Sequence, residues 1–129
     1  MDQRKLIYNA IARAINSQFP NVYVSQRYEL VPKQVPCVFI EQISKVRTKI
    51  YATLDNSDDQ YRIAFEVQVY ANTLAEGYEI MDCVENAFKS IAFFEEMCIP
   101  MENANLAMFR LVARFSAQVG GTPYEMSTL

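Results

Sequence analysis

Two long runs of alternating apolar and polar residues, separated by one helix signal, constrain the fold of this chain more than any other feature. The first run covers residues 61–70 (YRIAFEVQVY) and the second covers residues 107–119 (AMFRLVARFSAQV). Alternation of this kind predicts strands with one buried face and one polar face. Between the runs, Thr73 and Glu76 have the spacing of a capping box, which predicts the start of an amphipathic helix. The block therefore predicts a sheet covered on one face.

Weaker signals extend this block toward both ends of the chain. Residues 3–18 carry apolar side chains at three- and four-residue spacing, which predicts a helix that stops before Pro20. Residues 22–24 and 37–43 are apolar and β-branched, so they predict two further strands, the second continuing toward residues 49–54. The polar run at 55–59 (DNSDD) is typical of a hairpin tip. Residues 94–105 are expected to form an irregular connection.

The helix that begins after Thr73 is expected to run to about Phe93 and to pack on the sheet through one apolar stripe. Gly77 lies in its first turns and lowers helix stability, and close packing against the sheet is one reason to keep a glycine there. The acidic residues of the opposite side, including Asp82 and Glu85, are expected to be solvated.

These elements predict a single small α+β domain over residues 1–129. Its sheet is expected to be mixed, mostly antiparallel, with about four to five strands and two helices packed on one face. A chain of 129 residues is long enough to bury a hydrophobic core as one domain. Residues 120–129 are expected to form a tail that is either flexible or ordered by a neighbouring molecule.

The residue composition argues against catalysis. The chain has no histidine and only three glycines, and it contains no nucleophile elbow, Walker loop or dinucleotide fingerprint. The cysteines lack metal-ligand or redox spacing and are expected to be reduced thiols: Cys37, Cys83 and Cys98. The acidic run at 55–59 is too short for a calcium loop and has no glycine. We therefore expect no enzyme activity, no catalytic residue, no cofactor and no metal site.

The charge pattern argues against stable binding of nucleic acid. The net charge is −3 and the twelve lysines and arginines are dispersed along the chain, whereas phosphate binding requires clustered cations. Loose passage of DNA past an acidic surface remains compatible with this composition. No apolar run is long enough to span a bilayer, and the N-terminus leads into a helix rather than a signal-peptide core. We expect a soluble protein made in a cytoplasm, with no membrane partner.

The polar face of the two alternating strands is the main candidate functional surface. It carries Arg62 and Glu66 on the first strand and Arg110 and Arg114 on the second. If the strands are neighbours, Glu66 can pair with either arginine of the second strand. Such a face is either solvated, or it forms a subunit contact or the lining of a channel.

The order of these elements resembles that of the tail-completion, or tail terminator, proteins of long-tailed bacteriophages. The resemblance rests on the opening helix, the proline-bounded strand VPCVFI at 35–40, the strand-to-cap segment VQVYANT at 67–73, and the long last strand. It implies a small α/β domain that assembles into a ring, commonly a hexamer. In this family the ring caps the finished tail tube, faces the head-side connector and lets DNA pass through its lumen.

The resemblance implies a structural virion protein at the tail–head junction, assembled in the host cytoplasm. The expected partners are further copies of the chain, the tail tube protein, the head–tail connector proteins and, transiently, DNA. Seven residues are expected at a subunit interface or in the lumen: Asp55, Asp58, Asp59, Arg62, Glu66, Arg110 and Arg114. The alternatives are a head-completion or neck protein, or a small non-enzymatic binding or regulatory module.

Overall fold

The computed structural model of this chain describes residues 3–26, 34–48, 60–101 and 108–120. These residues form α1 (Gln3–Gln18), β1 (Tyr23–Ser25), β2 (Cys37–Thr48), β3 (Gln60–Ala71), α2 (Leu74–Ser90), β4 (Phe94–Met101) and β5 (Phe109–Gly120). The strands make one sheet in the order β1-β2-β3-β5-β4. Only the β1–β2 pair is parallel among these neighbours. The predicted α+β fold class is confirmed.

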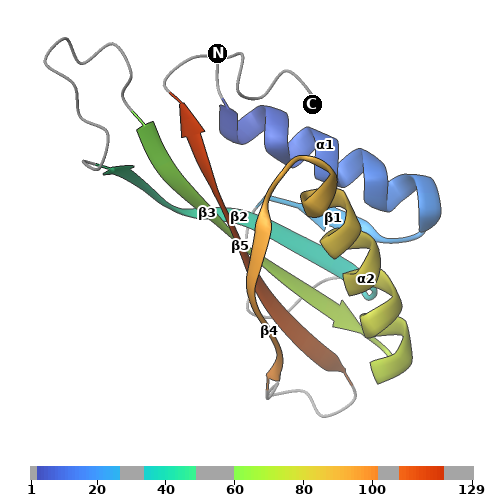
Figure 1. Ribbon diagram of the computed structural model, residues 1–129. Helices are drawn as coiled ribbons and strands as arrows, with labels where there is room; N and C mark the ends of the chain where they lie inside the picture. The colour runs from blue at the N-terminus through green and yellow to red at the C-terminus, as the bar shows by residue number, and fades with distance from the viewer. Residues whose placement is uncertain (1–2, 27–33, 49–59, 102–107, 121–129) are drawn as a thin grey trace, which may run out of the picture.

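Both helices lie on the same face of the sheet (Figure 1), and the hydrophobic core lies between the helices and that face. The strands and helices bury most of the apolar side chains that the two periodicities predicted, although Leu74 at the start of α2 and Phe109 at the start of β5 are exposed. The most completely buried of them are Ile7, Ile11, Ile15, Ile63, Phe65, Val67, Val69, Ile80, Met81, Val84, Phe88, Leu111, Ala113 and Phe115. No helix among the described residues is long and apolar enough to cross a membrane.

The chain after α2 differs from the prediction. The helix ends at Ser90 rather than near Phe93, because Ala92 adopts a left-handed backbone with φ 66°. The segment Phe94–Met101 then forms β4, where the sequence predicts an irregular connection. The bulge between Glu95 and Met97 interrupts the alternation of this strand, so a search for regular alternation misses it.

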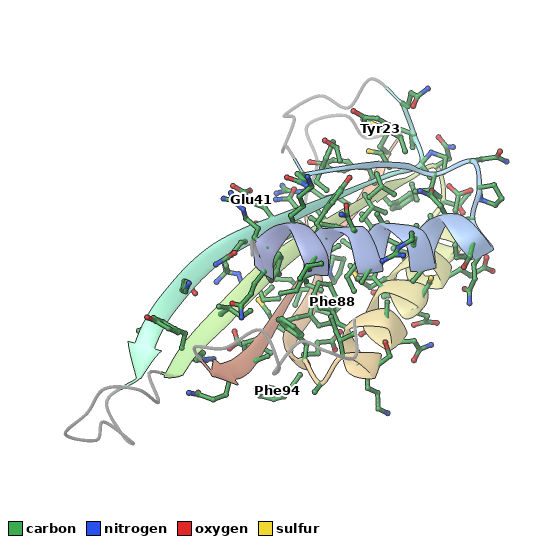
Figure 2. All side chains as sticks on the ribbon, turned by 90° about the horizontal axis from the view of Figure 1, so that it is seen from above. Tyr23, Glu41, Phe88 and Phe94 are labelled. Carbon is green, nitrogen blue, oxygen red and sulfur yellow. The ribbon has the colours of Figure 1, made fainter. Side chains whose placement is uncertain are left out.

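The remaining predicted strands are present with shifted ends. The short first strand covers Tyr23–Ser25, one residue later than predicted, and β2 extends to Thr48. The predicted continuation at 49–54, the hairpin tip at 55–59 and the tail after Gly120 lie outside the described residues. In both figures the end of β2 and the start of β3 extend beyond the two helices (Figures 1 and 2). This part of the sheet is therefore uncovered on both faces by helix.

The start of α2 confirms the predicted cap. The Glu76 backbone N–H donates to the Thr73 hydroxyl at 3.1 Å, and the Glu76 carboxylate accepts from the Asn72 N–H at 3.1 Å. A Cβ on Gly77 would lie 3.2 Å from the Leu111 side chain, so the glycine does permit close packing of helix on sheet. The cap and this contact together fix where α2 begins over β5.

Loss of the cap gives a testable change in stability. Replacing Thr73 by alanine leaves a helix N–H without its hydroxyl partner, so we expect the free energy of unfolding to fall by about 1 kcal/mol. Urea denaturation measures this change. Thr73→Ser keeps the hydroxyl and should stay close to the parent protein. An equal loss in both variants would show that the cap contributes little.

Candidate functional site

We call the sheet face that points away from both helices the open face. β3 and β5 are neighbours on it, with Glu66 in register with Arg114 and Tyr70 in register with Arg110. Four of the predicted site residues lie on this face: Arg62, Glu66, Arg110 and Arg114. The other three, Asp55, Asp58 and Asp59, lie outside the described residues. β3 and β5 are therefore neighbours, as the predicted pairing of Glu66 with an arginine of the last strand requires.

A hydrogen-bonded network crosses the open face between β3 and β5. The Arg114 guanidinium donates to the Glu66 carboxylate at 3.2 Å, and the other carboxylate oxygen accepts from the Gln68 amide at 3.1 Å. The Gln68 carbonyl oxygen accepts from Arg110 at 3.1 Å and from the Tyr70 hydroxyl at 3.4 Å. The predicted pairing of Glu66 is therefore confirmed for Arg114, whereas Arg110 bonds Gln68.

The position of Gln68 explains this choice of partner. Its side chain is only 7 % exposed, so its amide must find hydrogen-bond partners inside the protein. An amide has both donors and an acceptor, and it bridges an acidic neighbour to a basic one. In the network it donates to Glu66 and accepts from Arg110. The sequence shows the charges of this face, but not that a buried glutamine connects them.

Arg62 links the open face to the edge of the sheet. Its guanidinium forms an ion pair with Glu96 of β4 and donates a 3.5 Å hydrogen bond to Ser116 of β5. The Arg62 side chain is about half exposed, and exposed pairs of this kind contribute at most about 1 kcal/mol. The pairing therefore affects the charge pattern of the surface more than the stability of the fold.

The middle of the open face is less solvated than the sequence predicts. Ala64, Gln68 and Ser116 are buried, and Phe39 and Tyr70 pack edge to face with ring centroids 5.7 Å apart. Large side chains on neighbouring strands reach across one another, so a mixed face still buries its centre. The exposed charges are confined to the ends of long side chains such as those of Arg62 and Arg114.

A cluster of acidic groups lies where α2 meets β4. The ligand atoms of Glu85, Glu95 and Cys98 all lie within 4.8 Å of one another. Burial above all, then Glu95 and then Asp82, raise the pKa of Glu85 to about 8. Burial, followed by the nearby carboxyl groups of Glu85, Glu95 and Asp82, raises the pKa of Cys98 to about 11. The prediction that Glu85 is fully solvated is wrong, because β4 packs beside it.

The ligand atoms of this acidic cluster lie close enough together to share one ion, but protonation of two of its members opposes metal binding. A metal ligand has to be deprotonated, whereas the raised pKa values of Glu85 and Cys98 favour their protonated forms. The cluster borders a surface pocket of about 430 Å³ lined by Glu85, Asn86, Lys89, Phe93, Phe94, Glu95 and Phe115. Cys98 is the thiol of this cluster, and its raised pKa disfavours the thiolate form that a nucleophile needs.

The sequence prediction missed the outer strand β4. Three apolar side chains of this strand are more than two-fifths exposed: Phe94, Ile99 and Met101. The available signal was composition, because residues 94–101 contain five apolar residues around two glutamates and a proline. The bulge between Glu95 and Met97 breaks the regular alternation of these residues, so the pattern does not reveal the strand.

Comparisons with known proteins agree with this architecture. Residues 6–120 match a family model described as phage tail terminator protein. One similar solved structure is a chain from the virion of a native gene transfer agent particle, with a TM-score of 0.62 and 11 % sequence identity. The alignment covers 88 % of this chain and 94 % of that one, and at this identity it shows a shared fold. No curated protein sequence matches the chain.

Proposed function

The chain belongs to the phage tail terminator family, and on that basis we propose that it forms a ring of identical subunits that caps the finished tail tube. A hexamer is the expected size. The ring would join the tube to the head connector at the tail–head junction, after assembly in the host cytoplasm. As a member of this family the protein is a structural component of a bacteriophage virion. Its proposed action is stoichiometric assembly without turnover.

The match to the tail terminator family over residues 6–120 is the observation that carries this proposal. It includes most of α1 and all of the elements from β1 to β5, so nearly the whole described fold takes part in the similarity. The edges of the sheet also support it. β4 exposes apolar side chains at one edge, which a monomer would leave in water and a subunit contact would cover.

The open face is the part of the subunit that we propose to border the lumen. Its cations already have partners, since Arg114 bonds Glu66, Arg62 bonds Glu96 and Arg110 bonds Gln68. Cations that are paired within the protein attract phosphate less than clustered free ones. Together with a net charge of −3, this pattern suits a channel through which DNA slides without being held.

We further propose that the acidic run containing Asp55, Asp58 and Asp59, together with residues 120–129, contacts neighbouring subunits or the end of the tail tube. Residues 55–59 and 121–129 lie outside the described residues, and this assignment rests on their composition and on the family. Acidic segments of this kind fit basic surfaces on a partner.

Removal of the protein from an infection tests the terminator assignment. We expect particles lacking it to accumulate as overlong or unjoined tails, measured by negative-stain electron microscopy, because nothing stops the growth of the tube. Resupply of the protein in trans should restore tails of normal length. Normal tails beside unstable heads would instead indicate a neck protein. A stable monomer in native mass spectrometry at all workable concentrations would contradict the ring.

A further inference from the structure

We propose that copies of this protein join head to tail by extending the sheet, with the β4 edge of one copy pairing against the outer edge of β2 in the next. This inference rests on the proposed function, because it identifies the contact through which the ring would close. The two edges lie on opposite sides of the molecule, marked by Tyr23 of β1 and Phe94 of β4 (Figure 2).

Both edges of the sheet offer strand length that no described residue pairs. β4 is the last strand of the sheet, so its outer side has no neighbour within the described ranges. At the other edge, β1 pairs only with Cys37–Phe39 of β2. This leaves β2 from Ile40 to Thr48 without an outer neighbour among the same residues. Unpaired backbone at a sheet edge is a template for pairing with another chain.

Both edges also expose apolar side chains. On β4, Phe94 is 65 % exposed and Ile99 is 44 % exposed. On β2, Val46 is 57 % exposed and Ile43 is 42 % exposed. A two-fold contact would pair one edge with the same edge of the second copy. A head-to-tail contact pairs the β4 edge of one copy with the β2 edge of the next. Two separate apolar edges on one chain therefore favour the head-to-tail arrangement.

The strand directions fit such a contact. β2 is antiparallel to β3, β3 to β5 and β5 to β4, so β4 runs opposite to β2. Rotation about a ring axis that lies roughly along the strands keeps these directions from copy to copy. β4 would then meet the next β2 as an antiparallel partner, which is the more stable kind of strand pair.

One register satisfies both the charges and the apolar contacts. If Glu95 lies opposite Lys45 of the next copy, Phe94 lies opposite Val46. Glu95 and Lys45 both belong to the helix-covered face, since they are in register with the core residues Phe115 and Ile63. Phe94 and Val46 both belong to the open face. Each face of the extended sheet would therefore match unlike charges or apolar surfaces.

The same register brings the irregular positions of the two strands close together. The bulge between Glu95 and Met97 would lie beside the bulge between Gln42 and Ser44 of the next copy. The pairing would end near Ile40, because β1 is the outer neighbour of β2 from Cys37 to Phe39. Bulges and an edge proline, here Pro100 of β4, normally limit strand pairing. Here they would restrict it to one register.

The charges near the contact have the required signs. Glu95 of β4 is an exposed carboxylate that lies in the acidic cluster with Glu85. Lys45 of β2 is exposed at the other edge, with its ammonium group 4.6 Å from the centre of the Tyr61 ring. A lysine from the next copy would reduce the repulsion within the acidic cluster. Such complementarity selects the partner and the register more than it adds affinity.

Two aspartate variants of the full chain test this contact. Phe94→Asp damages the β4 edge and keeps the β2 edge, while Val46→Asp does the reverse. We expect each variant alone to be monomeric, with assembly weakened roughly 100-fold or more. Mixed together, they should form one-to-one dimers and no larger species, because only one pair of intact edges remains. Native mass spectrometry separates these masses.

Other outcomes are equally clear. Self-dimers of Val46→Asp alone would indicate a two-fold contact of β4 with itself and would overturn the proposal. Ring formation by each variant alone would also overturn it, while leaving the proposed ring function intact. A wild-type protein that forms no ring would contradict the proposed function itself. Both replaced side chains are more than half exposed, so unchanged thermal unfolding midpoints should verify that the variants fold.

A charge exchange tests the register independently. Glu95→Lys places two lysines opposite each other and should weaken assembly about tenfold. The double variant that also carries Lys45→Glu restores unlike charges at every contact, so assembly should recover toward that of the parent protein. Failure of the second substitution to recover any assembly would exclude the register that pairs Glu95 with Lys45.

Discussion

Replacement of Phe88 by alanine is expected to lower the free energy of unfolding by about 3–5 kcal/mol. Phe88 is fully buried, and its ring stacks on Phe115 with centroids 4.3 Å apart and planes 8° from parallel. Phe93 and Phe65 contact the same ring at centroid distances of 5.2 and 6.0 Å. These four residues join α2 to β3 and β5, so the cavity would open where the helix rests on the sheet.

Thermal and urea unfolding measure the effect. A domain of this size should unfold roughly 10–20 °C lower, because the loss is a large part of a typical stability of about 5–15 kcal/mol. Tyr78→Ala is the matched control, since Tyr78 is an exposed aromatic residue of the same helix. Both variants should be compared at concentrations below those of subunit association. Equal unfolding midpoints for the two variants would contradict the packing described above.

The phenylalanine cluster also shows what sequence patterns are able to predict. Alternation placed Phe65 and Phe115 on one face of the sheet, and helical spacing placed Phe88 on the stripe that covers it. These positions follow from periods that side-chain geometry enforces. The contact of Phe93 was not predictable in the same way. It depends on the left-handed backbone at Ala92, which ends the helix earlier than its composition suggests.

The open face shows where sequence reasoning stops. Its charged residues could be assigned from alternation alone, and the Glu66–Arg114 pair followed once β3 and β5 were neighbours. The partner of Arg110 could not be assigned, because Glu66 and Gln68 are adjacent on the same face and only burial favours the amide. Hydrogen-bond choices between adjacent positions depend on exposure, which a linear pattern does not encode.

The edge strand was missed for a related reason. Within the described residues β4 pairs with β5 alone, and the bulge between Glu95 and Met97 breaks the alternation that identified β3 and β5. The same omission hid the surroundings of Glu85, which helical spacing assigns to the solvated side of α2. Glu95 of β4 lies next to it and changes its environment. Because β4 was not predicted, the environment of Glu85 on α2 was predicted wrongly as well.

The surroundings of Glu85 lead to the second large prediction, which concerns pH. Burial, together with the neighbouring Glu95 and Asp82, raises the pKa of Glu85 from 4.5 to about 8. Lys89 of the same helix borders the pocket, and Cys98 faces the cluster from β4. Between these two pKa values the folded protein therefore holds a proton that the unfolded chain releases.

This linkage fixes the sign of the effect. Stability from a group with a raised pKa is fully present below its unfolded pKa and is lost as the pH rises through its folded pKa. The free energy of unfolding should therefore decrease between about pH 5 and about pH 8. Because Glu85 is partly exposed, solvent screening limits the decrease to on the order of 2 kcal/mol. The protein should be more stable in mildly acidic than in mildly alkaline solution.

Glu85→Gln isolates this contribution, because glutamine has a similar shape and does not ionise. The variant should match the parent protein near pH 5 and exceed its stability near pH 8.5, as measured by urea midpoints across this range. Glu79→Gln removes an exposed carboxylate from the same helix and should leave the slope with pH unchanged. Measurements should stop near pH 8.5, because the raised pKa of Cys98 affects stability above that range. Parallel curves for the Glu85 variant and the parent protein would show that this carboxyl group does not hold the proton.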